Sequence, residues 1–168
     1  MTRRSILYIP VSAGQPHSAE SKVELASGTG GTVLVMDDEL PVRDVLGGTL
    51  HALGYTVTLA RDGSEAVARF KSRPAERRPF NLVILDLTVR GGMGGAAALS
   101  RLKKIDSEVR AVAMSGYSNS PILADHKAYE FIGRLEKPFL ANELKALLVE
   151  VMPGTRVGPP TEAAASRP

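Results

Sequence analysis

The chain has 168 residues, of which 43% are hydrophobic and 23% charged, a balance typical of a soluble globular protein with one folded domain. The formal charge of +3 does not indicate nucleic-acid binding, because the basic residues are scattered and their densest cluster, at 71–79, contains no aromatic residue. Cysteine is absent, which excludes disulfides, and no apolar run approaches the ~20 residues of a membrane-spanning helix. We therefore expect a cytoplasmic protein that binds neither membrane nor nucleic acid.

Composition divides the chain into three parts. Residues 1–30 contain a short β-prone stretch at 5–11, followed by a Ser-, Gly- and Ala-rich segment typical of a linker. Residues 153–168 are rich in Pro, Gly and Ala with almost no large apolar residue, and we expect them to be disordered. The predicted folded domain spans residues 31–152.

Within this domain, stretches typical of strands and of helices alternate five times. A strand at 32–37 leads to a helix at 39–53, and a strand at 55–60 leads to a helix at 62–71. The next pairs are a strand at 81–86 with a helix at 95–104, a strand at 109–114 with a weak helix at 121–128, and a strand at 129–136 with a helix at 140–151. The first, third and fourth strands lack in–out alternation, so both faces of their sheet should be covered. The pattern predicts an α/β fold, a doubly wound parallel sheet of five strands.

Polar residues follow the predicted strands at their carboxyl ends, where ligands bind in such folds. Asp37 and Asp38 follow the first strand, and Asp86 closes the apolar run NLVILD of the third. Ser115 follows the fourth strand and Lys137 the fifth. Each residue alone has an ordinary explanation, such as a helix cap for Asp38, a turn for Ser115 or a surface charge for Lys137. Their joint position at one sheet edge predicts a site.

Three carboxylates clustered at this edge need more positive charge than one lysine supplies. Two carboxylates about 4 Å apart repel by about 4 kcal/mol at an effective dielectric constant near 20. Oxygen ligands without nearby His or Cys favour a hard cation, and Mg²⁺ is the usual one where phosphate is handled. A carboxylate beside such an ion and Lys137 can attack phosphorus, while the Ser115 hydroxyl donates to an oxygen of the transferred group. The pattern therefore predicts an aspartyl phosphate.

Four segments together resemble the receiver domain of response regulators: VLVMDDE (33–39), VILDLTVRGGMGG (83–95), AMSGYS (113–118) and LEKPF (135–139). They occur in the family's order over about residues 31–151. The resemblance implies a flavodoxin-like (βα)5 fold with strand order 2-1-3-4-5. It also implies a phosphoacceptor of two-component signalling or a phosphorelay, which is not a dedicated enzyme. The expected partner is a sensor histidine kinase or a histidine phosphotransfer protein, and the expected cofactor is Mg²⁺.

The same resemblance assigns roles to individual residues. Asp86 is the expected phosphoacceptor, Lys137 contacts the phosphate, and Ser115 reorients on phosphorylation. The peptide bond between Lys137 and Pro138 is expected to be cis, a form that only X–Pro bonds adopt at modest cost. The expected Mg²⁺ ligands are Asp37, Asp38, Asp86 and the backbone carbonyl of Thr88.

Three residues modify this expectation. Arg90, four residues after Asp86, replaces the family's usual proline, which suggests a looser loop. Arg134 replaces the aromatic or apolar residue that couples Ser115 to the surface, so aromatic switching is in doubt here. Tyr117 is bulky enough to hinder the water that attacks the phosphoryl group. We therefore predict slow autodephosphorylation.

The motifs DLTVRGGMGG and MSGYSN are similar to those of receivers at the C-terminus of hybrid sensor histidine kinases. SILYIPVSA (5–13) is similar to the last strand of a kinase ATP-binding domain, so the chain could be the tail of such a kinase. Two other functions stay open. A haloacid-dehalogenase-type phosphatase uses similar residues, but it places its nucleophile on the first strand and its acidic pair last. A phosphorylation-independent interaction module would keep the fold without the chemistry. The motifs leave the oligomeric state open, and a monomer is compatible with them.

Overall fold

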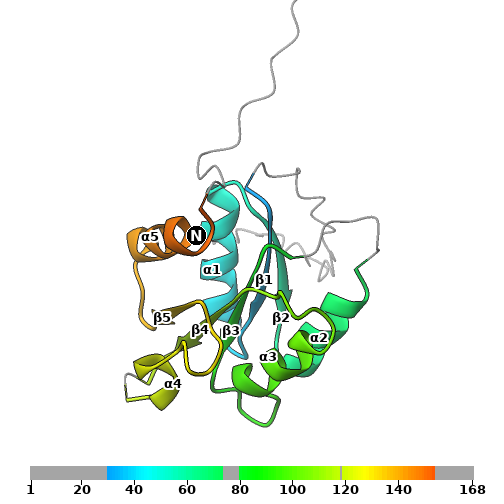
Figure 1. The fold of residues 1–168 in the computed structure, drawn as a ribbon. Helices are drawn as coiled ribbons and strands as arrows, with labels where there is room; N and C mark the ends of the chain where they lie inside the picture. Colours follow the sequence, from blue (N-terminus) through cyan, green and yellow to red (C-terminus); the bar gives the residue numbers. More distant parts are fainter. Residues whose placement is uncertain (1–29, 74–79, 118, 154–168) are drawn as a thin grey trace, which may run out of the picture.

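The structure is a computed structural model that describes residues 30–73, 80–117 and 119–153 (Figure 1). The predicted linker and tail lie outside these residues, apart from one border residue each. The strands are Thr32–Met36 (β1), Thr56–Ala60 (β2), Leu82–Asp86 (β3), Ala111–Ser115 (β4) and Gly133–Glu136 (β5). The helices are Leu40–Ala52 (α1), Gly63–Lys71 (α2), Gly95–Lys103 (α3), Pro121–Ala124 (α4) and Ala141–Val151 (α5).

The five strands form one sheet in the order β2-β1-β3-β4-β5, and every neighbouring pair is parallel. This confirms the predicted doubly wound, flavodoxin-like sheet. β1 lies between β2 and β3, with Val33 opposite both Val57 and Leu82. Because all strands run the same way, their carboxyl ends meet at one edge of the sheet.

Helices cover both faces of the sheet (Figure 1). On one face, α1 and α5 pack over the inward residues of the strands, with Leu46, Leu50 and Leu144 fully buried. On the other face, α2, α3 and α4 pack through buried residues that include Ala66, Leu102 and Leu123. β1, β3 and β4 are buried almost throughout, which explains why their sequences lack alternation.

The fourth βα unit differs from its prediction. The predicted helix at 121–128 ends at Ala124, and turns follow it as far as Glu130, whose φ of 64° lies in the left-handed region. The predicted strand at 129–136 begins only at Gly133. Phe131 contributed to the apolar pattern that predicted the strand. Its side chain is buried, but the residue lies at the end of a turn, where its N–H donates a hydrogen bond to the His126 carbonyl. Its apolar character therefore reflects core packing and not strand structure.

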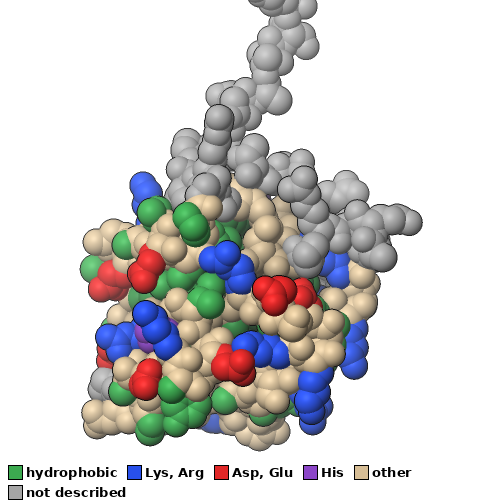
Figure 2. Space-filling view, in the orientation of Figure 1, with side chains coloured by type: hydrophobic (Ala, Val, Ile, Leu, Met, Phe, Trp, Pro, Cys, Tyr) green, Lys and Arg blue, Asp and Glu red, His purple; other side chains and the backbone are tan. Residues whose placement is uncertain are grey.

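None of the helices in the described part of the chain has the length and apolarity needed to cross a bilayer. On the face shown in Figure 2, acidic and basic side chains are interspersed, without a uniformly basic area. This mixture matches the scattered charges of the sequence.

Candidate functional site

The carboxyl edge of the sheet brings together the residues that were predicted to meet there. Asp37 directly follows β1, Asp86 and Ser115 end β3 and β4, and Lys137 directly follows β5. Asp37 is 0% exposed, Asp86 2% and Ser115 1%, and among the described residues outside the hydrophobic core these three polar side chains are the buried ones. Buried polar groups are costly without partners, so their concentration at one point marks a functional centre.

Lys137 joins the two buried carboxylates. Its Nζ atom lies 2.5 Å from Oδ2 of Asp37 and 3.1 Å from Oδ2 of Asp86. Burial lowers the pKa of Lys137, but both carboxylates oppose this, and its pKa lies above the ordinary value. Burial raises the pKa of Asp86, an effect that Lys137 reduces. One ammonium thus holds together two buried carboxylates, Asp37 and Asp86.

Main-chain groups complete the shell around these side chains. The Thr88 N–H donates to Oδ1 of Asp86 at 3.3 Å, and the Tyr117 N–H donates to the Ser115 hydroxyl oxygen at 3.1 Å. The Lys137 N–H donates to the Ser115 carbonyl at 2.8 Å, which ties β5 to β4 at the site. The Lys137–Pro138 peptide bond is cis, as expected. The Ser115 hydroxyl accepts one bond and keeps its own proton to donate.

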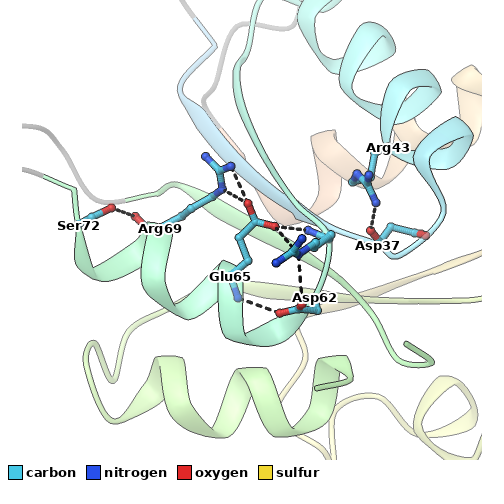
Figure 3. Close-up of polar contacts among 7 residues, drawn as sticks. Asp37, Arg43, Asp62, Glu65, Arg69 and Ser72 are labelled. Carbon is cyan, nitrogen blue, oxygen red and sulfur yellow. Dashed lines mark hydrogen bonds and ion pairs between the residues drawn. The ribbon is translucent and has the colours of Figure 1, made fainter. Parts of the chain in front are cut away.

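The acidic residues after β1 form a candidate cation site. Carboxylate oxygens of Asp37, Asp38 and Glu39 all lie within 4.8 Å of one another. The Glu39 N–H donates to Oδ1 of Asp37 at 2.9 Å, and Arg43 on α1 donates to the Asp37 carbonyl (Figure 3). Glu39 was not among the predicted ligands, although its place in the run DDE could have suggested it. It is also Glu39, not Asp38, that occupies the N-cap position of α1, and it does so without a side-chain cap bond.

Asp38 instead contacts the loop between β3 and α3. Its Oδ2 atom accepts a hydrogen bond of 3.2 Å from the Arg90 N–H. Farther along the loop, the Gly63 N–H of α2 donates to the Met93 carbonyl at 2.8 Å. A Cβ atom on Gly95 would lie 2.7 Å from the Asp86 carbonyl oxygen, so the loop returns to the strand at a distance that only glycine permits. These contacts hold the loop at Arg90 and beyond it, and the looser loop suggested by the loss of proline at position 90 stays a prediction.

A pocket of about 310 Å³ opens above these groups, lined by Asp38, Glu39, Asp86, Thr88, Arg90, Gly116, Tyr117 and Lys137. The Tyr117 side chain is 65% exposed at its rim. Arg134 is not part of this lining, because it lies on the outer side of β5, where its Nη1 donates to the Leu123 carbonyl at 2.6 Å. The pocket is large enough for a phosphoryl group and a hydrated cation, and it combines anionic and cationic walls.

The comparison with known families decides the assignment. A model of the response regulator receiver domain matches residues 33–149, more than half of the chain. The chain belongs to this family. Receivers are modules of two-component signalling, and the match removes the support for a haloacid-dehalogenase-type phosphatase.

Known relatives of this receiver differ in how much of their own length the chain covers. It is 36% identical over 116 residues to the nitrogen assimilation regulatory protein NtrX of Azorhizobium caulinodans, covering 67% of this chain and 24% of that protein. It is 28% identical over 122 residues to sporulation initiation phosphotransferase F of Bacillus subtilis, covering 72% of this chain and 93% of that protein. The chain therefore spans about a quarter of the first relative and nearly all of the second.

Among solved structures, the receiver resembles the response regulator protein TrrA of Thermotoga maritima, crystallised in complex with Mg²⁺ and BeF. The TM-score is 0.62 at 26% identity, and the alignment covers 73% of this chain and 99% of TrrA. This likeness agrees with the fold and with an acidic site at the carboxyl edge of the sheet.

Proposed function

We propose that this receiver, formed by residues 31–152, accepts a phosphoryl group on Asp86 from a histidine kinase or a histidine phosphotransfer protein. The observation that carries the proposal is the ion pair of Lys137 with two buried carboxylates at the sheet edge. A structural salt bridge needs one carboxylate, whereas a phosphoacceptor site needs a nucleophilic carboxylate, a second anion for a metal and a cation for the phosphoryl oxygens.

The residues at the edge fit a bound Mg²⁺ by the chemistry of their donors. Only oxygen ligands converge here, as hard cations require, and the carboxylates outnumber the nearby lysine. Asp37, Asp38, Asp86 and the backbone carbonyl of Thr88 would hold the ion, with Glu39 near enough to contribute through a water molecule. When bound, Mg²⁺ supplies positive charge that offsets the phosphoryl oxygens.

The chemical step transfers phosphorus between two side chains. A carboxylate oxygen of Asp86 attacks the phosphorus of a phosphohistidine, the new O–P bond forms, and the N–P bond breaks. The imidazole nitrogen keeps the electron pair of the broken bond and takes up a proton afterwards. The Lys137 ammonium and the Ser115 hydroxyl donate hydrogen bonds to the oxygens of the transferred group. The aspartyl phosphate is then lost to water or passed to another histidine.

The partner should contact the surface beside the pocket, formed by α1 and the loop at 115–120, of which residue 118 lies outside the described residues. Leu40, Val45, Tyr117 and Leu140 are large apolar residues that are exposed there or next to it. A groove of about 450 Å³ adjoins them, lined by Glu39, Pro41, Val42, Val45, Gly116, Lys137, Pro138 and Phe139. Exposed apolar side chains in one area are typical of protein interaction sites. We infer a cytoplasmic location, and the similarity of its motifs to receivers of hybrid histidine kinases leaves both a stand-alone regulator and a part of such a kinase open.

The test is direct phosphorylation. The full chain is incubated with acetyl phosphate and Mg²⁺, and its intact mass is measured. We expect the mass to rise by one phosphoryl group in the wild type and in the control Asp44→Asn, which changes an exposed carboxylate on α1. Asp86→Asn should show no gain. A gain that persists in Asp86→Asn would reject the acceptor, and no gain in any form would favour a phosphorylation-independent interaction module.

A further inference from the structure

The hydrogen bond between Arg90 and Asp38 joins two halves of the site that are 52 residues apart in the chain. Asp38 belongs to the acidic loop after β1, and Arg90 belongs to the loop that carries Thr88 after β3. The donor is the main-chain N–H of Arg90, and the acceptor is Oδ2 of the half-buried Asp38 carboxylate, at 3.2 Å. Proline, the residue that the family usually has at this position, has no N–H and could not make this bond.

We propose that the main-chain N–H of Arg90 is a positioning group for Asp38, and that it prepares the acidic cluster for a divalent cation. The inference rests on the proposed function. A carboxylate has two oxygens, and this bond occupies only one of them. An aspartate without such a partner would change rotamer freely, and cation binding would have to offset the lost freedom. Hydrogen bonds that orient metal ligands raise metal affinity in this way.

Hydrogen bonds on both sides of Arg90 fix the loop between β3 and α3. Two residues before Arg90, the Thr88 N–H donates to Asp86, and three residues after it the Met93 carbonyl accepts from Gly63. The donor at position 90 is therefore held between two fixed points. The Arg90 side chain lines the pocket but makes no ion pair among the described residues, so its N–H and its guanidinium can be tested separately.

A pair of substitutions separates these two groups. Arg90→Ala removes the guanidinium and keeps the N–H, whereas Arg90→Pro removes both. Mg²⁺ is titrated into the full chain, and the dissociation constant is read from amide shifts by NMR. We expect Arg90→Pro to bind Mg²⁺ about tenfold more weakly than Arg90→Ala, the low end of the loss for an outer hydrogen bond to a metal ligand. Arg90→Ala should bind at least as tightly as the wild type, because it removes a positive charge from the pocket.

A second measurement requires no proline and no metal. In Mg²⁺-free buffer, Asp38→Ala should accelerate hydrogen exchange of the Arg90 amide, while the Gly63 amide, bonded to Met93, keeps its rate. An unchanged Arg90 rate, or equal Mg²⁺ affinities of Arg90→Pro and Arg90→Ala, would overturn the positioning role and leave the phosphoacceptor intact. A wild type that binds no Mg²⁺ would overturn both proposals.

Discussion

Lys137 Nζ lies 2.5 Å from Oδ2 of Asp37, a carboxylate that is completely buried. A buried carboxylate without a partner is strongly unfavourable, and here the same lysine also serves Asp86. We therefore expect Lys137 to contribute to the stability of the fold as well as to the proposed chemistry. The proposed metal and phosphoryl site concentrates negative charge, and Lys137 is the cation that pairs with both buried carboxylates.

Replacing Lys137 by methionine should destabilise the protein when Mg²⁺ is absent. We expect the free energy of unfolding to fall by about 3 kcal/mol, because two buried carboxylates lose their cation. Urea denaturation measures the loss, and Mg²⁺ should restore part of it by binding the native state. The matched control Lys145→Met, an exposed position on α5, should change stability by less than about 0.5 kcal/mol. Equal losses for both variants would contradict this interpretation.

Tyr117→Ala should shorten the lifetime of the phosphoryl group. The Tyr117 ring stands at the pocket rim, whereas its N–H, which holds the Ser115 hydroxyl, is kept in the variant. A steric barrier of about 1 kcal/mol corresponds to roughly fivefold faster hydrolysis once the ring is removed. The decay of phosphorylated protein is followed by intact mass, with Tyr129→Ala as a control at an exposed tyrosine outside the pocket lining. A half-life of seconds that Tyr117→Ala leaves unchanged would refute the prediction.

Glu65 on α2 should make stability depend on pH in the acid range. It accepts bonds from the Arg61 N–H at 2.9 Å and from the Arg69 side chain at 2.6 Å (Figure 3). The hydrogen bond from the Arg61 N–H is the main cause that lowers the pKa of Glu65 below its ordinary value of 4.5. The Arg69 side chain lowers this pKa further. The stabilisation is therefore present above the ordinary pKa and is lost as the pH falls through the lowered one.

Glu65→Gln should accordingly cost less than about 1 kcal/mol at pH 7, since the group is partly exposed. The difference from the wild type should disappear in strongly acidic buffer. Thermal unfolding at several pH values measures the effect, and Glu108→Gln, an exposed residue of a turn, is the control. A difference that grows as the pH falls would have the wrong sign for this account.

Arg134→Ala should loosen the short helix α4. The Arg134 guanidinium donates to the Leu123 carbonyl, one of the terminal carbonyls that a four-residue helix cannot satisfy within itself. Loss of about 1 kcal/mol of hydrogen bonding corresponds to roughly fivefold faster hydrogen exchange at the amides of 124–125. Arg101→Ala, at an exposed position on α3, should leave these amides unchanged. If both variants exchange alike, Arg134 does not hold α4.

The order of strands and helices and the meeting of Asp37, Asp86, Ser115 and Lys137 were accessible from the sequence. Apolar periodicity is a local property of the chain, and it marked the buried strands before any contact was known. Parallel strands also place all their carboxyl ends at one edge, so residues after different strands could be assigned to one site without coordinates. The subsequent match of residues 33–149 to receivers agrees with that reasoning.

The hydrogen bond from Arg90 to Asp38 and the early end of α4 were visible only in the folded chain. Each depends on the direction of a main-chain group or on the approach of distant segments. Neither property can be recognised from the spacing of apolar and polar residues in the sequence. Phe131 shows the same limit, because burial makes a turn residue and a strand residue equally apolar. Residue types can specify which groups gather at an edge, but the donor that faces each acceptor follows from how the loops close over it.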